Sequence, residues 1–140
     1  MECRLGCALG RLLKPILGLL CIALGASVAC SEPIGPESVG VIERYSPPEV
    51  YRTWWAEVEA CSGLQGDFDR VRWYVKGQSG QFRYRGAYVF AYWWPSHEIV
   101  IAGGQVANDM VVRHEMLHDL LGSGEHSPEY FVSRCGMIVR

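Results

Sequence analysis

The sequence predicts a small α+β domain. Two segments with helical periodicity flank a stretch rich in strand-forming residues, and a chain of 140 residues is long enough for one domain. Hydrophobic residues make up 49% of the chain and charged residues 20%, which excludes a disordered protein. The net charge of -2 gives no basic surface, so we expect no nucleic acid as a partner.

The N-terminal residues have the order of a secretory signal. Three basic side chains come first, residues 16–26 form an apolar stretch, and small residues precede Cys30. This order is typical of an export signal, and its apolar stretch is too short to span a membrane. We therefore assign residues 1–29 to a signal peptide.

The segment around Cys30 resembles the signal of bacterial lipoproteins. The resemblance implies that Cys30 becomes lipidated and anchors an exported protein to a membrane of the cell envelope. The alternative is cleavage by ordinary signal peptidase at the same bond, which would give a soluble secreted protein. Residues 30–45 contain several prolines and glycines and would form a tether, and residues 46–140 would form the domain.

The number of cysteines supports this assignment. Three of the six cysteines precede Cys30 and would leave with the signal peptide. If Cys30 carries the lipid, Cys61 and Cys135 remain, and an oxidising compartment permits them to pair as a disulfide.

The first element expected in the domain is a helix. Ser46, two prolines and Glu49 have the order of a helix start. Apolar residues at helical spacing then continue to about Cys61, and Gly63 is expected to end the helix.

Three segments with strand composition follow. Residues 71–76 predict one strand, residues 82–94, interrupted by Gly86, predict one bent strand or two, and residues 99–102 predict another. Together they predict a sheet of three to four strands.

A second helix is expected to begin at Asn108 or Asp109 and to end near Leu121, before Gly122. Apolar residues lie on nearly all of its sides, which predicts a buried helix. Residues 127–135 predict a last, short helix.

The buried helix contains the sequence HExxH over residues 114–118. Residues four apart lie one turn apart on the same face, so His114 and His118 can direct two imidazoles at one point. Such a pair can fill two corners of a zinc tetrahedron, and Glu115 could take the proton of a zinc-activated water. Burial of two histidines without partners would be costly, and a metal ion would supply the partner.

His126 is the expected third ligand, because glycines after the helix allow the chain to turn back. Glu129 and Glu125 are the alternatives, whereas Asp119 is expected to point away from His114. Three protein ligands leave the fourth position for water, as in catalytic zinc sites.

Residues 114–126 resemble the active-site helix of zincin metallopeptidases, in particular of the metzincin branch. The resemblance implies a zincin-like domain in which His114, His118 and His126 bind Zn²⁺ and Glu115 is the general base. One departure is that His126 comes eight residues after the second histidine, later than the third histidine of metzincins.

Together these inferences predict an exported, monomeric zinc-dependent peptidase that acts on peptides or proteins. In zincins the substrate pairs with an edge strand, and residues 99–102 are the candidate for it, although they could also form an ordinary core strand. His97 is expected to be a surface or structural histidine rather than a ligand. The alternative function is that of a non-catalytic, zinc-stabilised envelope lipoprotein that acts as a binding module.

Overall fold

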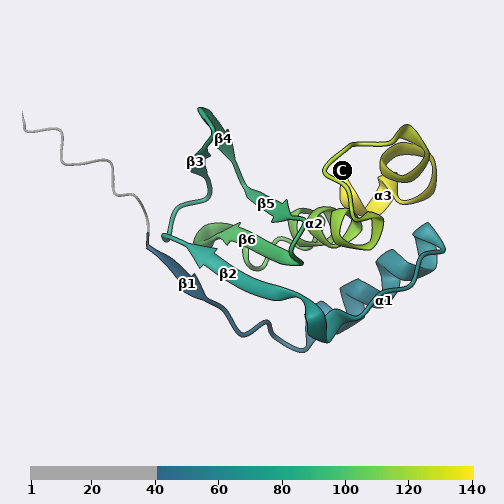
Figure 1. Ribbon diagram of the computed structural model, residues 1–140, viewed down its shortest axis with the longest axis horizontal. Helices are drawn as coiled ribbons and strands as arrows, with labels where there is room; N and C mark the ends of the chain where they lie inside the picture. Colours follow the sequence, from purple (N-terminus) through teal and green to yellow (C-terminus); the bar gives the residue numbers. More distant parts are fainter. Residues whose placement is uncertain (1–40) are drawn as a thin grey trace, which may run out of the picture. The chain divides into compact units, whose positions relative to one another are not determined.

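A computed structural model describes residues 41–140, so the predicted signal peptide, Cys30 and most of the predicted tether lie outside the described residues. The described part confirms the α+β class (Figure 1). The strands are β1 (Ile42–Arg44), β2 (Arg72–Lys76), β3 (Phe82–Tyr84), β4 (Ala87–Val89), β5 (Ala91–Trp94) and β6 (Glu98–Ala102). The helices are α1 (Val50–Ser62), α2 (Asp109–Leu121), the π-helix η3 (Glu129–Arg134) and α3 (Gly136–Val139), with 3₁₀ turns η1 (Phe68–Arg70) and η2 (Gly103–Gln105).

Four strands form one sheet in the order β1-β2-β6-β5. Strands β2 and β6 are parallel, with Trp73 opposite Ile99, and the two outer pairs are antiparallel. Strands β3 and β4 form a separate antiparallel hairpin. Strand β1 falls within the range assigned to the tether, so the sheet includes residues that precede Ser46.

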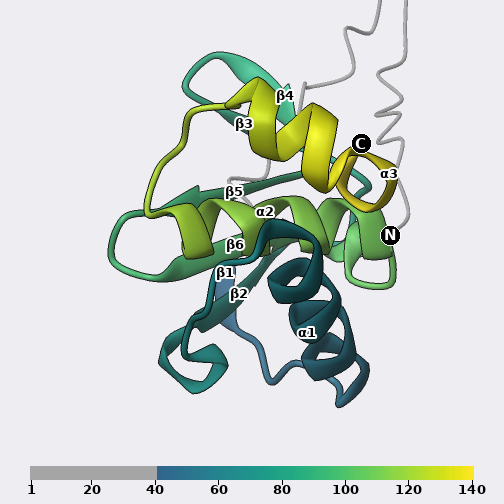
Figure 2. The same cartoon turned by 90° about the vertical axis from the view of Figure 1, so that its right-hand side faces the viewer.

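Successive side chains along each strand point to opposite faces of the sheet, and both faces carry apolar residues. One face packs against α1 and α2, and its core includes Trp73, Ile99 and Ile101. On the other face, Val100 and Ala102 pack with the β3–β4 hairpin. In Figure 2, α2 crosses the sheet with α1 on one side and η3 and α3 on the other. Helix α2 is therefore enclosed on several sides, as its apolar sequence predicts.

Two strand predictions need correction. Residues 82–94 form three short strands, because Arg85 and Gly86 both adopt positive φ in a tight hairpin turn and Phe90 separates β4 from β5. Residues 99–102 belong to β6, which lies between β2 and β5, so of the two alternatives the ordinary core strand is confirmed and the edge strand is wrong. The edge next to β6 is β5.

The predicted first helix begins later than expected. Helix α1 starts at Val50, and no side chain caps its N-terminus, so Ser46 does not have the expected role. Its end agrees with the prediction, since Gly63 adopts the left-handed conformation that closes the helix.

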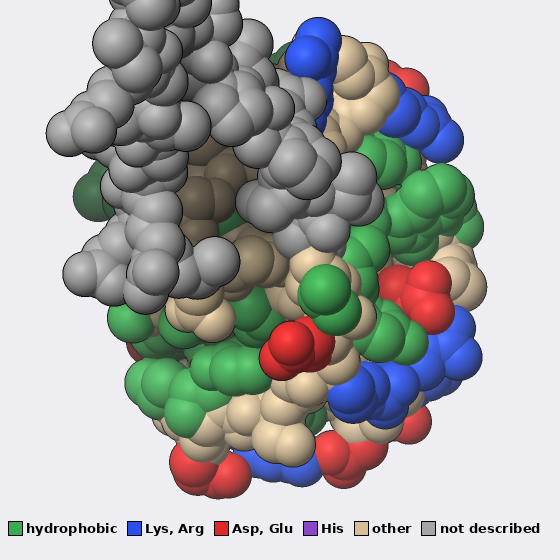
Figure 3. Space-filling view, turned by 90° about the vertical axis from the view of Figure 1, so that its left-hand side faces the viewer, with side chains coloured by type: hydrophobic (Ala, Val, Ile, Leu, Met, Phe, Trp, Pro, Cys, Tyr) green, Lys and Arg blue, Asp and Glu red, His purple; other side chains and the backbone are tan. Residues whose placement is uncertain are grey.

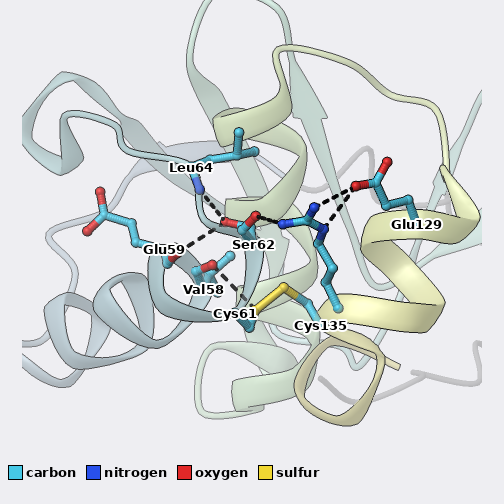
Figure 4. Close-up of a disulfide and its surroundings, with 8 residues drawn as sticks. Val58, Glu59, Cys61, Ser62, Leu64, Glu129 and Cys135 are labelled. Atoms are coloured by element: carbon cyan, nitrogen blue, oxygen red, sulfur yellow. Dashed lines mark hydrogen bonds and ion pairs between the residues drawn. A yellow bond between two sulfur atoms is a disulfide. The ribbon is translucent and has the colours of Figure 1, made fainter.

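The structure contains a disulfide between Cys61 and Cys135 (Figure 4). It joins the end of α1 to the junction of η3 and α3. Beside it, the Arg134 guanidinium donates hydrogen bonds to the Ser62 carbonyl oxygen, at 3.0 Å, and to the Glu129 carboxylate, at 2.9 Å. The C-terminal segment is thus fixed to α1 by one covalent and one polar connection.

Figure 3 shows hydrophobic, basic and acidic groups interspersed on one face of the described domain. Among the described residues, no helix is long and apolar enough to cross a bilayer.

Candidate metal centre

Helix α2 positions the HExxH residues. The Asn108 side chain accepts a hydrogen bond from the Val111 amide, so Asn108 rather than Asp109 is the cap. Inside the helix, Met116 and Leu117 are fully buried in the core. This packing fixes the rotation of the helix about its axis. Because its rotation is fixed, α2 turns His114 and His118 toward the segment that follows it.

The chain returns to the histidines after the helix. Gly122 adopts the left-handed conformation, with φ of 61°, and its amide donates to the last turn of α2. The loop that follows brings His126 back beside His114. The glycine turn that the sequence predicts therefore returns the third histidine to the helix.

The three imidazoles converge through their Nε2 atoms. His114 Nε2 lies 2.9 Å from His126 Nε2 and 3.2 Å from His118 Nε2. Nitrogen atoms in a zinc tetrahedron with bonds of about 2.0–2.1 Å lie about 3.3–3.4 Å apart, so these spacings are close to those of a bound ion. The three histidines can therefore hold a metal ion.

Hydrogen bonds on the other ring nitrogen favour the ligand form of two histidines. His114 Nδ1 lies 3.0 Å from the Val139 carbonyl oxygen, and His118 Nδ1 lies 2.8 Å from the Ser123 carbonyl oxygen. A carbonyl only accepts, so each Nδ1 carries the proton and each neutral Nε2 presents a lone pair. Two lone pairs facing each other at 3.2 Å repel, and a cation between them removes that cost.

Burial keeps these rings neutral. It lowers the pKa of His118 to about 4 and also lowers the pKa of His114, and the neighbouring histidines lower both further. Both rings are therefore uncharged near pH 7, which is the state that binds a metal. His126 is exposed, so the centre has one side open to solvent.

Phe131 contacts all three histidines, and no feature of the sequence predicts this. Its ring centroid lies 4.9 Å from that of His114, 4.7 Å from that of His118 and 4.8 Å from that of His126. The side chain is buried in the core. An aromatic residue in a short C-terminal helix carries no motif, so nothing in the sequence alone indicated this role.

Glu115 follows His114 in α2. The residue is 7% exposed, and burial raises the pKa of its carboxyl group to about 8. Glu115 and His114 line the same pocket, which extends away from the histidines. A carboxyl group with this access can exchange a proton with a molecule held in the pocket.

A second polar cluster lies behind His118. The Asp119 carboxylate accepts a hydrogen bond of 2.6 Å from Trp93 Nε1 and lies 3.0 Å from His97 Nδ1. The Trp93 ring stacks on the His118 ring, with centroids 6.4 Å apart and planes inclined by 19°. Asp119 is outside the group of metal-capable histidines, as expected, and His97 has Asp119 as its partner.

The two alternative third ligands are not part of the histidine group. The Glu129 carboxylate pairs with Arg134, and Glu125 is exposed in the loop. Cys61 and Cys135 form the disulfide, and Cys30 lies outside the described residues.

Comparison of the chain with protein-family models, with curated proteins and with solved structures gave no match.

Proposed function

We propose that this protein is an exported zinc-dependent peptidase. The observation that carries the proposal is the convergence of three Nε2 atoms, two of them on rings whose Nδ1 is held by a backbone carbonyl. Such a donor set leaves one tetrahedral position for a further ligand, which is the arrangement of a catalytic rather than a structural zinc site.

The donor atoms support zinc as the metal. Three neutral imidazoles suit zinc and other late transition metals, whereas magnesium and calcium prefer oxygen ligands. Within the described residues, the group that contains the three histidines includes no carboxylate. When bound, zinc would act as a Lewis acid on a substrate carbonyl and would lower the pKa of a water molecule.

Glu115 is the proposed general base. Its carboxylate would take a proton from the attacking water and then give this proton to the leaving amine nitrogen. A cation nearby opposes the effect of burial and favours the ionised form that this role needs. A peptide could reach Glu115 along β5, because β5 ends the described sheet and Ala91 in this strand lines the same pocket.

We also propose that the chain is exported and anchored through a lipid on Cys30. The disulfide supports export, because such bonds persist in oxidising compartments. Mass spectrometry of the protein from a bacterial host with lipoprotein processing would show the acyl mass on Cys30, and replacing Cys30 with Ser would release the protein from membranes.

The deciding experiment compares the wild type with Glu115→Gln. We expect about one zinc ion per chain in both proteins, hydrolysis of a peptide library by the wild type, and loss of at least about a hundredfold in the variant. Glu43→Gln is the matched control, because Glu43 is exposed on β1 and its substitution should leave activity unchanged. Zinc binding without hydrolysis by the wild type would refute the peptidase and favour a zinc-stabilised binding module of the envelope.

A further inference from the structure

The sheet face opposite α1 and α2, here called the outer face, carries a continuous aromatic cluster. Tyr74 on β2 and Tyr92 on β5 lie on this face, on either side of β6. Tyr84 of the β3–β4 hairpin stacks on Tyr92, with ring centroids 4.2 Å apart. Trp94 packs edge-on against both of these rings. Part of the outer face is therefore a layer of aromatic rings.

Basic side chains lie among and over these rings. They are Arg44, Arg72, Lys76 and Arg85. The Arg85 guanidinium carbon lies 5.2 Å from the ring centroid of Tyr84 and 5.5 Å from that of Trp94. The Arg44 guanidinium carbon lies 5.4 Å from the ring centroid of Tyr74. A ring beneath a guanidinium group holds it in place, and its N–H groups can still donate to an anion.

The charges of the described residues are divided unequally. Against its four basic side chains the outer face carries one acidic side chain, Glu98, which pairs with Arg72 at 3.0 Å. The rest of the described residues carry six basic and eleven acidic side chains. A negatively charged surface would therefore attract the outer face and repel the remainder of the domain.

The exposed apolar groups on this face suit a lipid surface better than a sugar. Ile42 is 47% exposed and Trp94 is 37% exposed. Tryptophan and tyrosine favour the boundary between lipid and water. A sugar would need open ring faces, whereas Tyr84 and Tyr92 cover each other and Arg85 lies over Trp94.

The outer face also lies close in sequence to the proposed anchor. Strand β1, which contributes Ile42 and Arg44 to this face, is the first element of the described chain. Val41 comes eleven residues after Cys30, a length of chain that reaches at most about 40 Å. A lipid on Cys30 would therefore keep the outer face within that distance of a bilayer.

We propose that the outer face docks on the surface of a bilayer that contains anionic lipids. The docking goes beyond the proposed peptidase and holds whether or not the chain cleaves peptides. A net attraction of a few charges is weak, so it orients an anchored chain and does not replace the anchor. Because α2 packs on the opposite face of the sheet, docking leaves the three histidines on the side away from the lipid.

Sedimentation with vesicles tests the docking without an acyl chain. The Cys30→Ser chain is mixed in low-salt buffer with vesicles of phosphatidylcholine alone or with about one third phosphatidylglycerol. We expect partition into the anionic vesicles to be at least about tenfold higher, and this excess to vanish near 1 M salt, where the screening length is about 3 Å. Equal partition into both vesicles, or none into either, would overturn the proposal.

A double variant locates the contact on the outer face. Arg44→Gln is combined with Arg85→Asn, since Arg85 has a φ of 48° and asparagine tolerates this left-handed backbone. Each basic charge near an anionic surface contributes about fivefold, so partition should fall at least about tenfold. Arg70→Gln with Arg140→Gln is the matched control, because it removes two exposed basic charges outside the outer face and should change partition less than about twofold. Equal losses in the two folded double variants would mean that net charge and not this face drives binding, which would refute the assignment.

Inorganic polyphosphate separates a bilayer from a soluble polyanion. At the same phosphate concentration, we expect weaker binding to polyphosphate than to the anionic vesicles, because the polymer offers no apolar boundary for Ile42 and Trp94. Binding to polyphosphate that equals or exceeds binding to vesicles would overturn the bilayer in favour of a soluble polyanion. None of these measurements needs zinc or hydrolysis, so a failure of the docking and a failure of the peptidase are separate results.

Discussion

Replacing Asp119 with alanine tests whether the cluster behind His118 stabilises the fold. The Asp119 side chain is 4% exposed and accepts hydrogen bonds from Trp93 Nε1 at 2.6 Å and from His97 Nδ1 at 3.0 Å. Replacement by alanine leaves the half-buried Trp93 indole N–H without an acceptor, which costs about 1–3 kcal/mol. It also removes the charge-assisted contact to His97, which is worth about 1–2 kcal/mol because His97 is partly open to water. We expect a total loss of about 3 kcal/mol.

Urea unfolding in the presence of a chelator measures this loss on the metal-free protein. Asp119→Asn should lose less, about 1–2 kcal/mol, because the amide oxygen can still accept from Trp93. Asp69→Ala is the matched control. Its carboxylate is 71% exposed and pairs with Arg52 at the surface, so it should lose less than about 1 kcal/mol. A free energy of unfolding for Asp119→Ala within about 0.5 kcal/mol of the wild type would refute the reasoning.

Three further outcomes are expected. Replacing His126 with alanine removes one of the three proposed ligands, so zinc binding should weaken by at least about a hundredfold in a competition titration. An unchanged affinity would exclude His126 as a ligand. For the metal-free protein, acid should reduce the contribution of His118 to stability between about pH 6.5 and pH 4, because burial lowers the pKa of His118 to about 4 and the unfolded chain therefore binds more protons at this residue. The raised pKa of Glu115 acts in the opposite direction in both proteins compared, so the His118 contribution is measured as the difference between the pH profiles of the wild type and His118→Gln, and we expect it to fall by about 2 kcal/mol after screening by solvent. Replacing Cys61 and Cys135 with serine should cost about 4 kcal/mol, because the bond closes a loop with a sequence separation of 74, and a midpoint in urea equal to that of the wild type would contradict this.

The spacing within α2 made part of the centre predictable. His114 and His118 are four positions apart, so any regular helix brings their rings to one face. His126 was predictable for a similar local reason, because Gly122 ends the helix with a left-handed turn and only a short loop separates the two. In each of these cases the chemistry depends on residues that are close in sequence.

Contacts between distant segments were harder to predict. Strand composition does not show which strand is central, so residues 99–102 could be expected at an edge or in the core, and in the structure β2 and β5 pair with the two sides of β6. The contact of Asp119 with His97 and Trp93 depends on how β5 and the turn after it pack on α2. A periodic pattern identifies a buried face but does not identify what will lie opposite that face.

The C-terminal segment positions the three histidines that could hold a metal ion. Phe131 packs beneath the three imidazoles, and the Val139 carbonyl orients His114. The same segment is tied to α1 by the Cys135 disulfide and by the bond from Arg134 to the Ser62 carbonyl. Because a core of this size leaves few buried residues to orient ligands, the covalent tie replaces packing that a larger domain would supply. The disulfide therefore constrains the tail that contacts the three histidines as well as stabilising the fold.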